Sequence, residues 1–351
     1  MKMMKMKRAT GIFKFVFPML AVFAVPQAAY CNSIALTAQG IADGFTLSTF
    51  ATTNPGATGC CSGPFGIAVT NNGNVIVSTG TGSSYVFADT DGQTPGSALF
   101  THSSNSGVSA YATAGGNPYG AQNGRFVEFN NDGTVNHTLT SVTATPNLGM
   151  WGNPVNGHII AASNSGLIDI DPLANGGLGS FRVINAGLFP DGVTVSPDGL
   201  TAYVENGGTI QAYSIATGTL LHTYNSFGTL SSPDGSGVIS SSNSLNGDII
   251  VNFNGNGSTT GGIGLIDPNT LAFTVIATGG TRGDYVSPDT NNGTLFLDYS
   301  DTVERLSCGT DCSIGGPPPP PSTVPEPGTL ALMGTGLSVL GAAVRRIRHT
   351  A

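Results

Sequence analysis

The stretch that decides the fold lies near the middle of the chain and reads Pro190-Asp191-Gly192-Val193-Thr194-Val195-Ser196-Pro197-Asp198-Gly199. Two Asp-Gly pairs, which suit tight turns, flank a short segment in which valine alternates with a polar residue, as in a strand. A glycine-containing turn that leads into apolar residues recurs at intervals of 41 to 49 residues. Its six copies are Pro64-Phe65-Gly66-Ile67, Asn105-Ser106-Gly107-Val108, Pro146-Asn147-Leu148-Gly149, Pro190-Asp191-Gly192-Val193, Pro233-Asp234-Gly235-Ser236 and Arg282-Gly283-Asp284-Tyr285. The chain therefore consists largely of six repeats.

Each repeat carries a second turn, where Asn, Asp and Gly provide the positive φ angles that a hairpin needs. These turns are Asn72-Gly73, Gly115-Gly116, Asn156-Gly157, Asp198-Gly199, Asn246-Gly247 and Asn292-Gly293. Five repeats then close with a strand, a polar turn and another strand. The polar turns of these five lie at Phe87-Ala88-Asp89, Phe129-Asn130-Asn131-Asp132-Gly133, Ile170-Asp171-Pro172, Tyr213-Ser214-Ile215-Ala216-Thr217-Gly218 and Ile266-Asp267-Pro268-Asn269. A complete repeat thus predicts four short strands.

The two ends of the repeat array complement each other. The sixth repeat stops after three strands at Val303-Glu304-Arg305-Leu306, whereas a lone alternating strand, Phe45-Thr46-Leu47-Ser48-Thr49-Phe50, precedes the first repeat. Because unpaired strand edges are a liability, we expect the lone strand to complete the sixth unit. The sequence therefore predicts an all-β fold, a six-bladed β-propeller over residues 45–308 closed by an N-terminal strand. An open stack of hairpins with the same period is the alternative.

The repeat body resembles a known architecture. With fragments such as Val195-Ser196-Pro197-Asp198-Gly199, it is similar to the broad group of bacterial six- or seven-bladed propellers. That architecture hosts lactonases, lyases, lectins and scaffolds alike, so the resemblance implies a fold and leaves the activity open.

Composition and charge narrow the class of partner. The 351 residues include 51 Gly and only 9% charged residues, which suits short strands and tight turns rather than helices. All four lysines lie in the first fourteen residues. Between residues 32 and 324 there are four arginines against 19 acidic residues, so this stretch carries a charge of about −15. Such a body repels nucleic acid and anionic lipid, whereas cations and sugar hydroxyls are acceptable ligands.

Residues 1–31 have the parts of a secretory signal peptide. A basic opening (Lys2, Lys5, Lys7 and Arg8) precedes an apolar run from Phe15 to Val25 and the small residues Ala28 and Ala29. The apolar run is too short for a retained membrane helix, which is the alternative. We therefore expect export followed by removal of this segment.

The other end has a second targeting pattern. A Pro-rich linker at residues 309–323 leads to Val324-Pro325-Glu326-Pro327, then to seventeen uncharged residues from Gly328 to Val344, and then to Arg345, Arg346 and Arg348. Seventeen residues just suffice to cross the hydrocarbon core, and terminal arginines hold that end in the cytoplasm. The pattern predicts a C-terminal transmembrane helix with the body facing outward.

Residues 324–351 closely resemble the PEP-CTERM sorting signal of Gram-negative bacteria, which joins a Pro-Glu-Pro motif to a short membrane span and a basic cluster. A plain tail anchor behind a proline linker is the alternative. The resemblance implies that Pro325, Glu326 and Pro327 are recognised by an exosortase, a membrane-embedded cysteine transpeptidase. It also implies tethering to the inner membrane by this helix, and then transfer to the cell surface or the extracellular matrix.

One group of residues in the repeats could bind a metal ion. Asn147, Asp191, Asp234 and Asp284 occupy similar places where repeats three to six begin, and in a propeller these places ring one mouth of the central channel. Oxygen ligands that converge in this way suit Ca²⁺, which is the candidate cofactor. Propeller lactonases of the gluconolactonase type use a metal at a comparable location. The alternative is that each Pro-Asp-Gly simply forms a turn.

Five cysteines remain to be assigned. If cleavage removes Cys31, an exported chain keeps four that can form bridges in an oxidising compartment. The strand order places Cys60 and Cys61 at the opposite face of the ring from Cys308. We therefore expect a local bridge between Cys308 and Cys312, with Cys60 and Cys61 either joined to each other or free.

Two classes of function follow from this reading. The first is a non-enzymatic binding or scaffold module in the envelope or exopolysaccharide matrix, with a polysaccharide or another envelope protein as its partner. The second is a metal-dependent propeller hydrolase or lactonase with its site at the channel mouth. The four histidines of the body, His102, His137, His158 and His222, lie in no catalytic motif.

Overall fold

The computed structural model describes residues 34–57, 63–103, 110–254, 261–280 and 282–316 of the 351. All of them belong to one compact unit, Asn32–Ala351. The predicted signal peptide, the motif at Pro325 to Pro327 and the predicted membrane helix lie outside these ranges. No helix within the ranges is long and apolar enough to cross a membrane.

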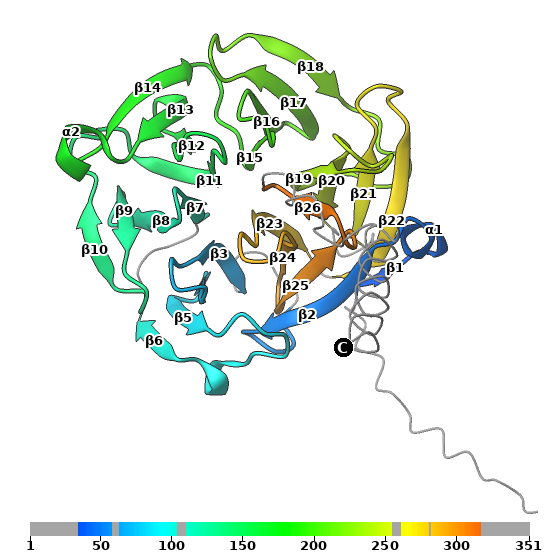
Figure 1. The fold of residues 1–351 in the computed structure, drawn as a ribbon, viewed down its shortest axis with the longest axis horizontal. Helices are drawn as coiled ribbons and strands as arrows, with labels where there is room; N and C mark the ends of the chain where they lie inside the picture. The colour runs from blue at the N-terminus through cyan, green and yellow to red at the C-terminus, as the bar shows by residue number, and fades with distance from the viewer. Residues whose placement is uncertain (1–33, 58–62, 104–109, 255–260, 281, 317–351) are drawn as a thin grey trace, which may run out of the picture. The chain divides into compact units, whose positions relative to one another are not determined.

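The described chain forms six antiparallel sheets arranged as the blades of a propeller, which confirms the predicted fold (Figure 1). Blade 1 comprises β3 (Pro64–Val69), β4 (Val75–Thr79), β5 (Ser83–Phe87) and β6 (Phe100–Ser103). Blade 2 comprises β7 (Ala112–Ala114), β8 (Asn117–Gln122), β9 (Arg125–Phe129) and β10 (Val135–Thr138). Blade 3 comprises β11 (Pro146–Gly152), β12 (Ile159–Ser163), β13 (Gly166–Asp171) and β14 (Ser180–Asn185).

The remaining blades follow the same order. Blade 4 comprises β15 (Val193–Val195), β16 (Thr201–Asn206), β17 (Thr209–Ser214) and β18 (Leu220–Tyr224). Blade 5 comprises β19 (Pro233–Ser241), β20 (Ile249–Phe253), β21 (Gly262–Ile266) and β22 (Phe273–Gly279). Blade 6 comprises β23 (Gly283–Pro288), β24 (Leu295–Tyr299), β25 (Thr302–Ser307) and β2 (Thr46–Thr52).

Blade 6 is closed by the N-terminal strand, as the sequence predicts. β2 pairs with β25 in an antiparallel register that runs from Thr46 opposite Ser307 to Thr52 opposite Thr302. The ring is therefore joined by strands from the two ends of the repeat array, and the open stack of hairpins is excluded.

Blade 5 has two additional strands that the repeat pattern does not contain. β1 (Ile34–Leu36) pairs with the outer strand β22, and β26 (Cys312–Ile314) pairs with the end of the innermost strand β19. β19 is nine residues long, so its last residues extend beyond β20 and offer β26 an unpaired edge. A disulfide joins Cys308 to Cys312 with their Cα atoms 5.7 Å apart, at the first residue of β26. Cys60 and Cys61 lie outside the described residues.

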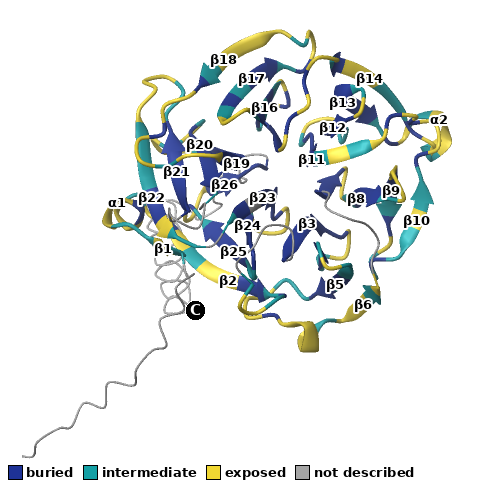
Figure 2. Ribbon diagram, turned by 180° about the vertical axis from the view of Figure 1, so that it is seen from behind, coloured by how far each residue is buried: buried dark blue, intermediate teal, exposed yellow. Residues whose placement is uncertain are grey.

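The core lies between neighbouring blades rather than at one centre. Figure 2 shows buried residues along the inner strands of each blade and exposed residues along outer strands such as β18. The largest fully buried side chains include Trp151, Phe253 and Phe296, each on an inner strand. Two short helices, α1 (Ala38–Ala42) and α2 (Ala174–Gly177), lie outside the blades.

The two glycine signals of each repeat have different physical roles. The second-turn glycines have positive φ angles, such as 83° at Gly73 and 72° at Gly199, which confirms the hairpin turns. Gly192, in contrast, has no positive φ, and a Cβ atom there would lie 2.0 Å from the Glu205 carboxylate and 2.4 Å from the Asp234 carbonyl oxygen. Glycine at this position allows blades 4 and 5 to approach closely. Interpreting Pro-Asp-Gly as a turn is wrong for blade 5, where Pro233, Asp234 and Gly235 begin β19.

Three of the four histidines that lie in no sequence motif occupy a repeated structural position. His102, His137 and His222 are each the third residue of an outer strand, and Arg182 is their equivalent in blade 3. The His102 Nε2 atom lies 2.6 Å from the Asp132 carbonyl oxygen, and the His137 Nε2 atom lies 2.9 Å from that of Gly177. Arg182 donates to the Ile215 carbonyl oxygen at 2.9 Å. Each hydrogen bond joins the outer strand of one blade to the turn between the third and fourth strands of the next. Basic side chains therefore stabilise the contacts between successive blades.

Ion pairs, rather than single hydrogen bonds, join blades 6 and 1. Arg305 in β25 forms ion pairs with Asp89 and Asp91 of blade 1 and with Asp289 of blade 6, the Nε–Oδ1 distance to Asp91 being 2.8 Å. Its guanidinium carbon lies 5.0 Å from the centroid of the Phe50 ring and 4.9 Å from that of Phe296.

Arg305 also offsets the repulsion among the carboxylates that surround it. Burial, together with the charge of Asp89, raises the pKa of Asp289 to about 6, and the positive charge of Arg305 opposes this rise. Removing Arg305 would therefore leave three close carboxylates without compensation.

We predict that Arg305→Met lowers the free energy of unfolding by about 3 kcal/mol at pH 7, because it leaves the buried carboxylate of Asp289 without its ion-pair partner. Denaturant titration of the exported protein measures this loss. The control is Arg125→Met on the exposed side of β9, which should change the free energy by about 0.5 kcal/mol or less. Equal unfolding midpoints for the two variants would contradict the assigned role of Arg305.

Candidate functional site

The predicted metal-binding residues lie at one end of the ring, where the innermost strands begin. Asn147 is the second residue of β11, Asp234 is the second of β19 and Asp191 lies just before β15. Asp284 is the second residue of β23, and its side chain lies outside the described part of the structure. We call this end, defined by Asp191, Asp234 and the adjacent Glu205, the acidic end.

The acidic end holds carboxyl groups in two different environments. The side chain of Asp191 is exposed, yet the surrounding protein displaces part of its hydration and raises its pKa, an effect that the charge of Arg282 opposes. Asp234 is buried and accepts a hydrogen bond from the Asn254 side-chain amide. The Asn147 side chain is exposed.

Glu205 is the residue that links these aspartates and that sequence reasoning missed. It lies in β16, is 2% exposed, bonds through its backbone amide to the Gly192 carbonyl oxygen of its own blade, and interacts electrostatically with Asp234 at the start of the next. Burial raises its pKa to about 8; the nearby Ser236 opposes this rise, and the charges of Asp234 and Asp191 add to it. A pKa of about 8 favours the protonated carboxyl group of Glu205 at neutral pH.

A sequence signal for Glu205 exists in the second strand of the repeats. Four second strands place a polar residue after three apolar or aromatic ones, beside the glycine-containing start of the first strand. These residues are Ser78, Glu205, Asn252 and Asp298. Each is buried, and the partners of two are evident: Ser78 accepts from the Gly66 amide at 2.9 Å, and Asn252 accepts from the Tyr299 hydroxyl at 2.9 Å. The repeat thus places a buried polar layer around the acidic end.

The acidic end brings the carboxyl group of Glu205 close to those of Asp191 and Asp234. Such a set attracts cations and accepts hydrogen bonds from hydroxyl groups. Among the residues that the structure describes, no group of three or more His, Cys, Asp or Glu side chains is arranged to hold a metal ion. The calcium site at Asn147, Asp191, Asp234 and Asp284 stays a prediction.

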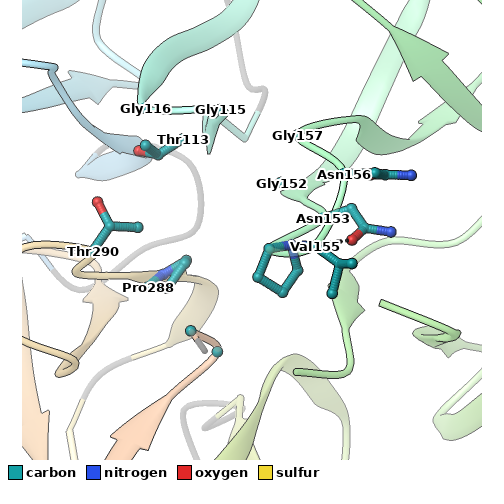
Figure 3. A pocket seen from close by; sticks show the side chains of 13 residues that line it. Thr113, Gly115, Gly116, Gly152, Asn153, Val155, Asn156, Gly157, Pro288 and Thr290 are labelled. Atoms are coloured by element: carbon teal, nitrogen blue, oxygen red, sulfur yellow. Dashed lines mark hydrogen bonds between the residues drawn. The ribbon is translucent and has the colours of Figure 1, made fainter. Parts of the chain in front are cut away.

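A cavity lies at the opposite end of the ring, where innermost strands finish. It has a volume of about 390 Å³ and is lined mainly by glycines and by small neutral side chains (Figure 3). Thr113 and Thr290 face it in Figure 3, and Gly315 and Gly316 of the chain beyond β26 complete its wall. We call this the glycine end. It offers a ligand no charged side chain among the residues that line it.

Comparison with known proteins identifies the tail. Residues 323–348 match the PEP-CTERM protein-sorting motif, which confirms the resemblance of this segment and implies recognition by an exosortase. The chain is therefore an exported protein with a membrane-anchored sorting signal and a propeller body. No curated protein sequence is significantly similar to the chain.

Solved structures agree with the fold. A gluconolactonase from Xanthomonas campestris superposes with a TM-score of 0.53 at 15% identity, over 79% of this chain and 95% of that one. Hydrazine synthase from Kuenenia stuttgartiensis gives a TM-score of 0.45 at 14% identity, over 69% of this chain and 75% of that one. The first likeness supports the propeller fold alone, and the second is too low to carry an argument.

We predict that Glu205 makes the protein less stable as pH rises. Its folded-state pKa of about 8 lies above its ordinary value of 4.5, so its contribution is fully present below pH 4.5 and is lost as pH rises through 8. Relative to Glu205→Gln, the wild type should lose on the order of a few kcal/mol between pH 5 and pH 9.

Chemical denaturation at pH 5, 7 and 9 measures this difference. The control is Asp311→Asn, because Asp311 is exposed and has a φ of 58° that asparagine tolerates well. The control should follow the wild type at each pH. If Glu205→Gln also followed the wild type, Glu205 would not be the group that holds the proton.

Proposed function

We propose that this exported propeller is a non-enzymatic binding or scaffold module that acts in the cell envelope or the exopolysaccharide matrix. The observation that carries the proposal is the acidic end, where Asp191 is exposed beside the buried Asp234 and Glu205. Carboxylates that accept hydrogen bonds suit the hydroxyl groups of a neutral polysaccharide. The strongly acidic body disfavours polyanions, which agrees with a neutral glycan as the ligand.

The sorting motif supports the destination. The resemblance of the tail to PEP-CTERM segments implies delivery to surface or exopolysaccharide-associated material, where the body would meet that polymer. The proposed partners are therefore the exosortase for the tail, and a polysaccharide or another envelope protein for the body.

Affinity electrophoresis of residues 32–316 through gels that contain a neutral glucan, a galactomannan or the anionic polymer alginate tests the binding role. We predict retardation by a neutral polymer and none by alginate. Asp191→Asn should weaken the retention about tenfold, because a hydrogen bond to a charged group contributes about 1.5 kcal/mol. Asp311→Asn is the matched control and should bind as the wild type does; failure of every neutral polymer to retard the protein would refute the binding role.

A metal-dependent hydrolase or lactonase is the second candidate function. The observation that favours it is the association of Glu205 with Asp191 and Asp234, since a perturbed carboxyl beside two others is typical of catalytic sites. Carboxylates and the Asn147 amide oxygen are suitable ligands for Ca²⁺. Stoichiometric calcium in the purified protein, together with lactone hydrolysis that Glu205→Gln abolishes, would replace the binding role with this one.

A further prediction concerns the sorting motif itself. Replacing Pro325, Glu326 and Pro327 by alanine should leave export intact and block processing of the tail, because the exosortase would no longer recognise it. Mass spectrometry and cell fractionation in the native host measure both effects. A variant with the mass and location of the wild type would show that these residues are not the recognition site.

A further inference from the structure

We propose that His158 and Asp171 of blade 3 form a binding site for a divalent transition-metal ion such as Zn²⁺, separate from the acidic end. His158 immediately precedes β12 and Asp171 is the last residue of β13, the antiparallel neighbour of β12. The His158 Nε2 atom lies 4.0 Å from the Asp171 Oδ2 atom. Both side chains are partly exposed, 30% and 40% respectively, so an ion from solution can reach them.

The imidazole is held with one nitrogen available. The His158 Nδ1 atom lies 2.8 Å from Asp169 Oδ1, and because a carboxylate only accepts, Nδ1 carries the hydrogen. In the neutral ring the lone pair is then on Nε2, which faces Asp171. A carboxylate that orients a histidine through its other nitrogen is the usual arrangement around metal-binding histidines.

The orienting carboxylate is itself fixed. Asp169 is 7% exposed, and its Oδ2 atom accepts a hydrogen bond of 2.7 Å from Arg182. Arg182 also donates to the Ile215 carbonyl oxygen of blade 4. The position of the His158 ring is therefore set by contacts that extend across two blades.

Asp171 is oriented in the same way. Its Oδ1 atom accepts from the backbone amides of Leu173 and Ala174 at 3.0 Å and 3.1 Å. These two bonds leave Oδ2 directed at His158. Both proposed ligand atoms are thus positioned in advance by other contacts of their own side chains.

The distance between the ligands requires only a small adjustment. Zinc bonds of about 2.0–2.2 Å to nitrogen and oxygen at a tetrahedral angle place the two ligand atoms roughly 3.4 Å apart. The observed 4.0 Å would narrow by about 0.6 Å, which partly exposed side chains can accommodate by small torsional changes. Water would complete the coordination, since the site has two protein ligands. Imidazole and carboxylate together suit zinc better than calcium.

Other histidines of the chain provide matched controls. The Nε2 atoms of His102 and His137 lie 2.6 Å and 2.9 Å from backbone carbonyl oxygens, so these atoms carry the hydrogen and have no lone pair for a metal. His137 has a side-chain exposure of 35%, close to that of His158. Substitution of His137 thus removes an equally accessible imidazole without touching the proposed site.

The test is calorimetric titration of the exported protein, without a polyhistidine tag, with Zn²⁺. Because Cys60 and Cys61 could also bind zinc, every variant is measured in a Cys60→Ser, Cys61→Ser background as well. We expect one zinc per chain, a loss of affinity of at least tenfold in His158→Gln and in Asp171→Asn, and no change in His137→Gln. Asp171→Asn keeps the oxygen that accepts from Leu173 and Ala174, so this variant should fold even if His158→Gln does not.

Two further measurements make the outcome decisive. Asp191→Asn should leave zinc binding unchanged, which separates this site from the acidic end, and a tenfold excess of Ca²⁺ should not displace the zinc. If the Cys60→Ser, Cys61→Ser protein without further substitutions bound no zinc, the proposal would be overturned. An equal affinity for His158→Gln and His137→Gln would also overturn it, and would identify the His158 and Asp171 contact as an ion pair only.

Discussion

The pairing of β2 with β25 is the constraint on which the rest of the structure depends. It joins Thr49 to Glu304, residues 255 positions apart, and turns a row of sheets into a ring. The interface is dense: Phe50 packs against Phe87 of blade 1 and Phe296 of blade 6, and Arg305 lies against the same rings. Because each blade buries its faces against two neighbours, an open ring would expose apolar surface on both sides of the break.

The few basic residues of the propeller body stabilise the contacts between neighbouring blades. Positively charged or hydrogen-bond-donating side chains at His102, His137 and Arg182 each cap a turn of the next blade, and Arg305 joins the last blade to the first. His102, His137 and Arg182 are each the third residue of the outer strand of their blade. The acidic surface therefore coexists with a small number of donors placed where blades meet.

Much of this architecture could be predicted from the sequence because it is periodic. The glycines of the hairpin turns, such as Gly73 and Gly199, need positive φ angles, and the lone strand at the N-terminus matches the missing strand at the end. Strands β1 and β26 could not be predicted, since three residues carry too little pattern and β26 depends on the extra length of β19.

The acidic end was only partly predictable for a related reason. Asp191 and Asp234 follow the repeat, but Glu205 is a single polar residue in a strand of apolar ones, and its importance depends on the approach of Asp234 from the next blade. Such contacts between blades cannot be predicted from the repeat pattern, because they depend on how neighbouring blades pack in the closed ring. Asn252 in the buried polar layer is a second example, because it accepts a hydrogen bond from Tyr299 of the next blade.

The described chain ends on one particular side of the propeller. After β26, Gly315 and Gly316 form part of the wall of the glycine end, and the segment with the sorting motif continues from there. Innermost strands begin at the acidic end and finish at the glycine end, so the two ends face opposite ways along the axis of the ring. The last described residue, Gly316, therefore lies at the end of the ring opposite Asp191, and the two ends of the propeller axis differ in charge as well as in the chain segments that reach them.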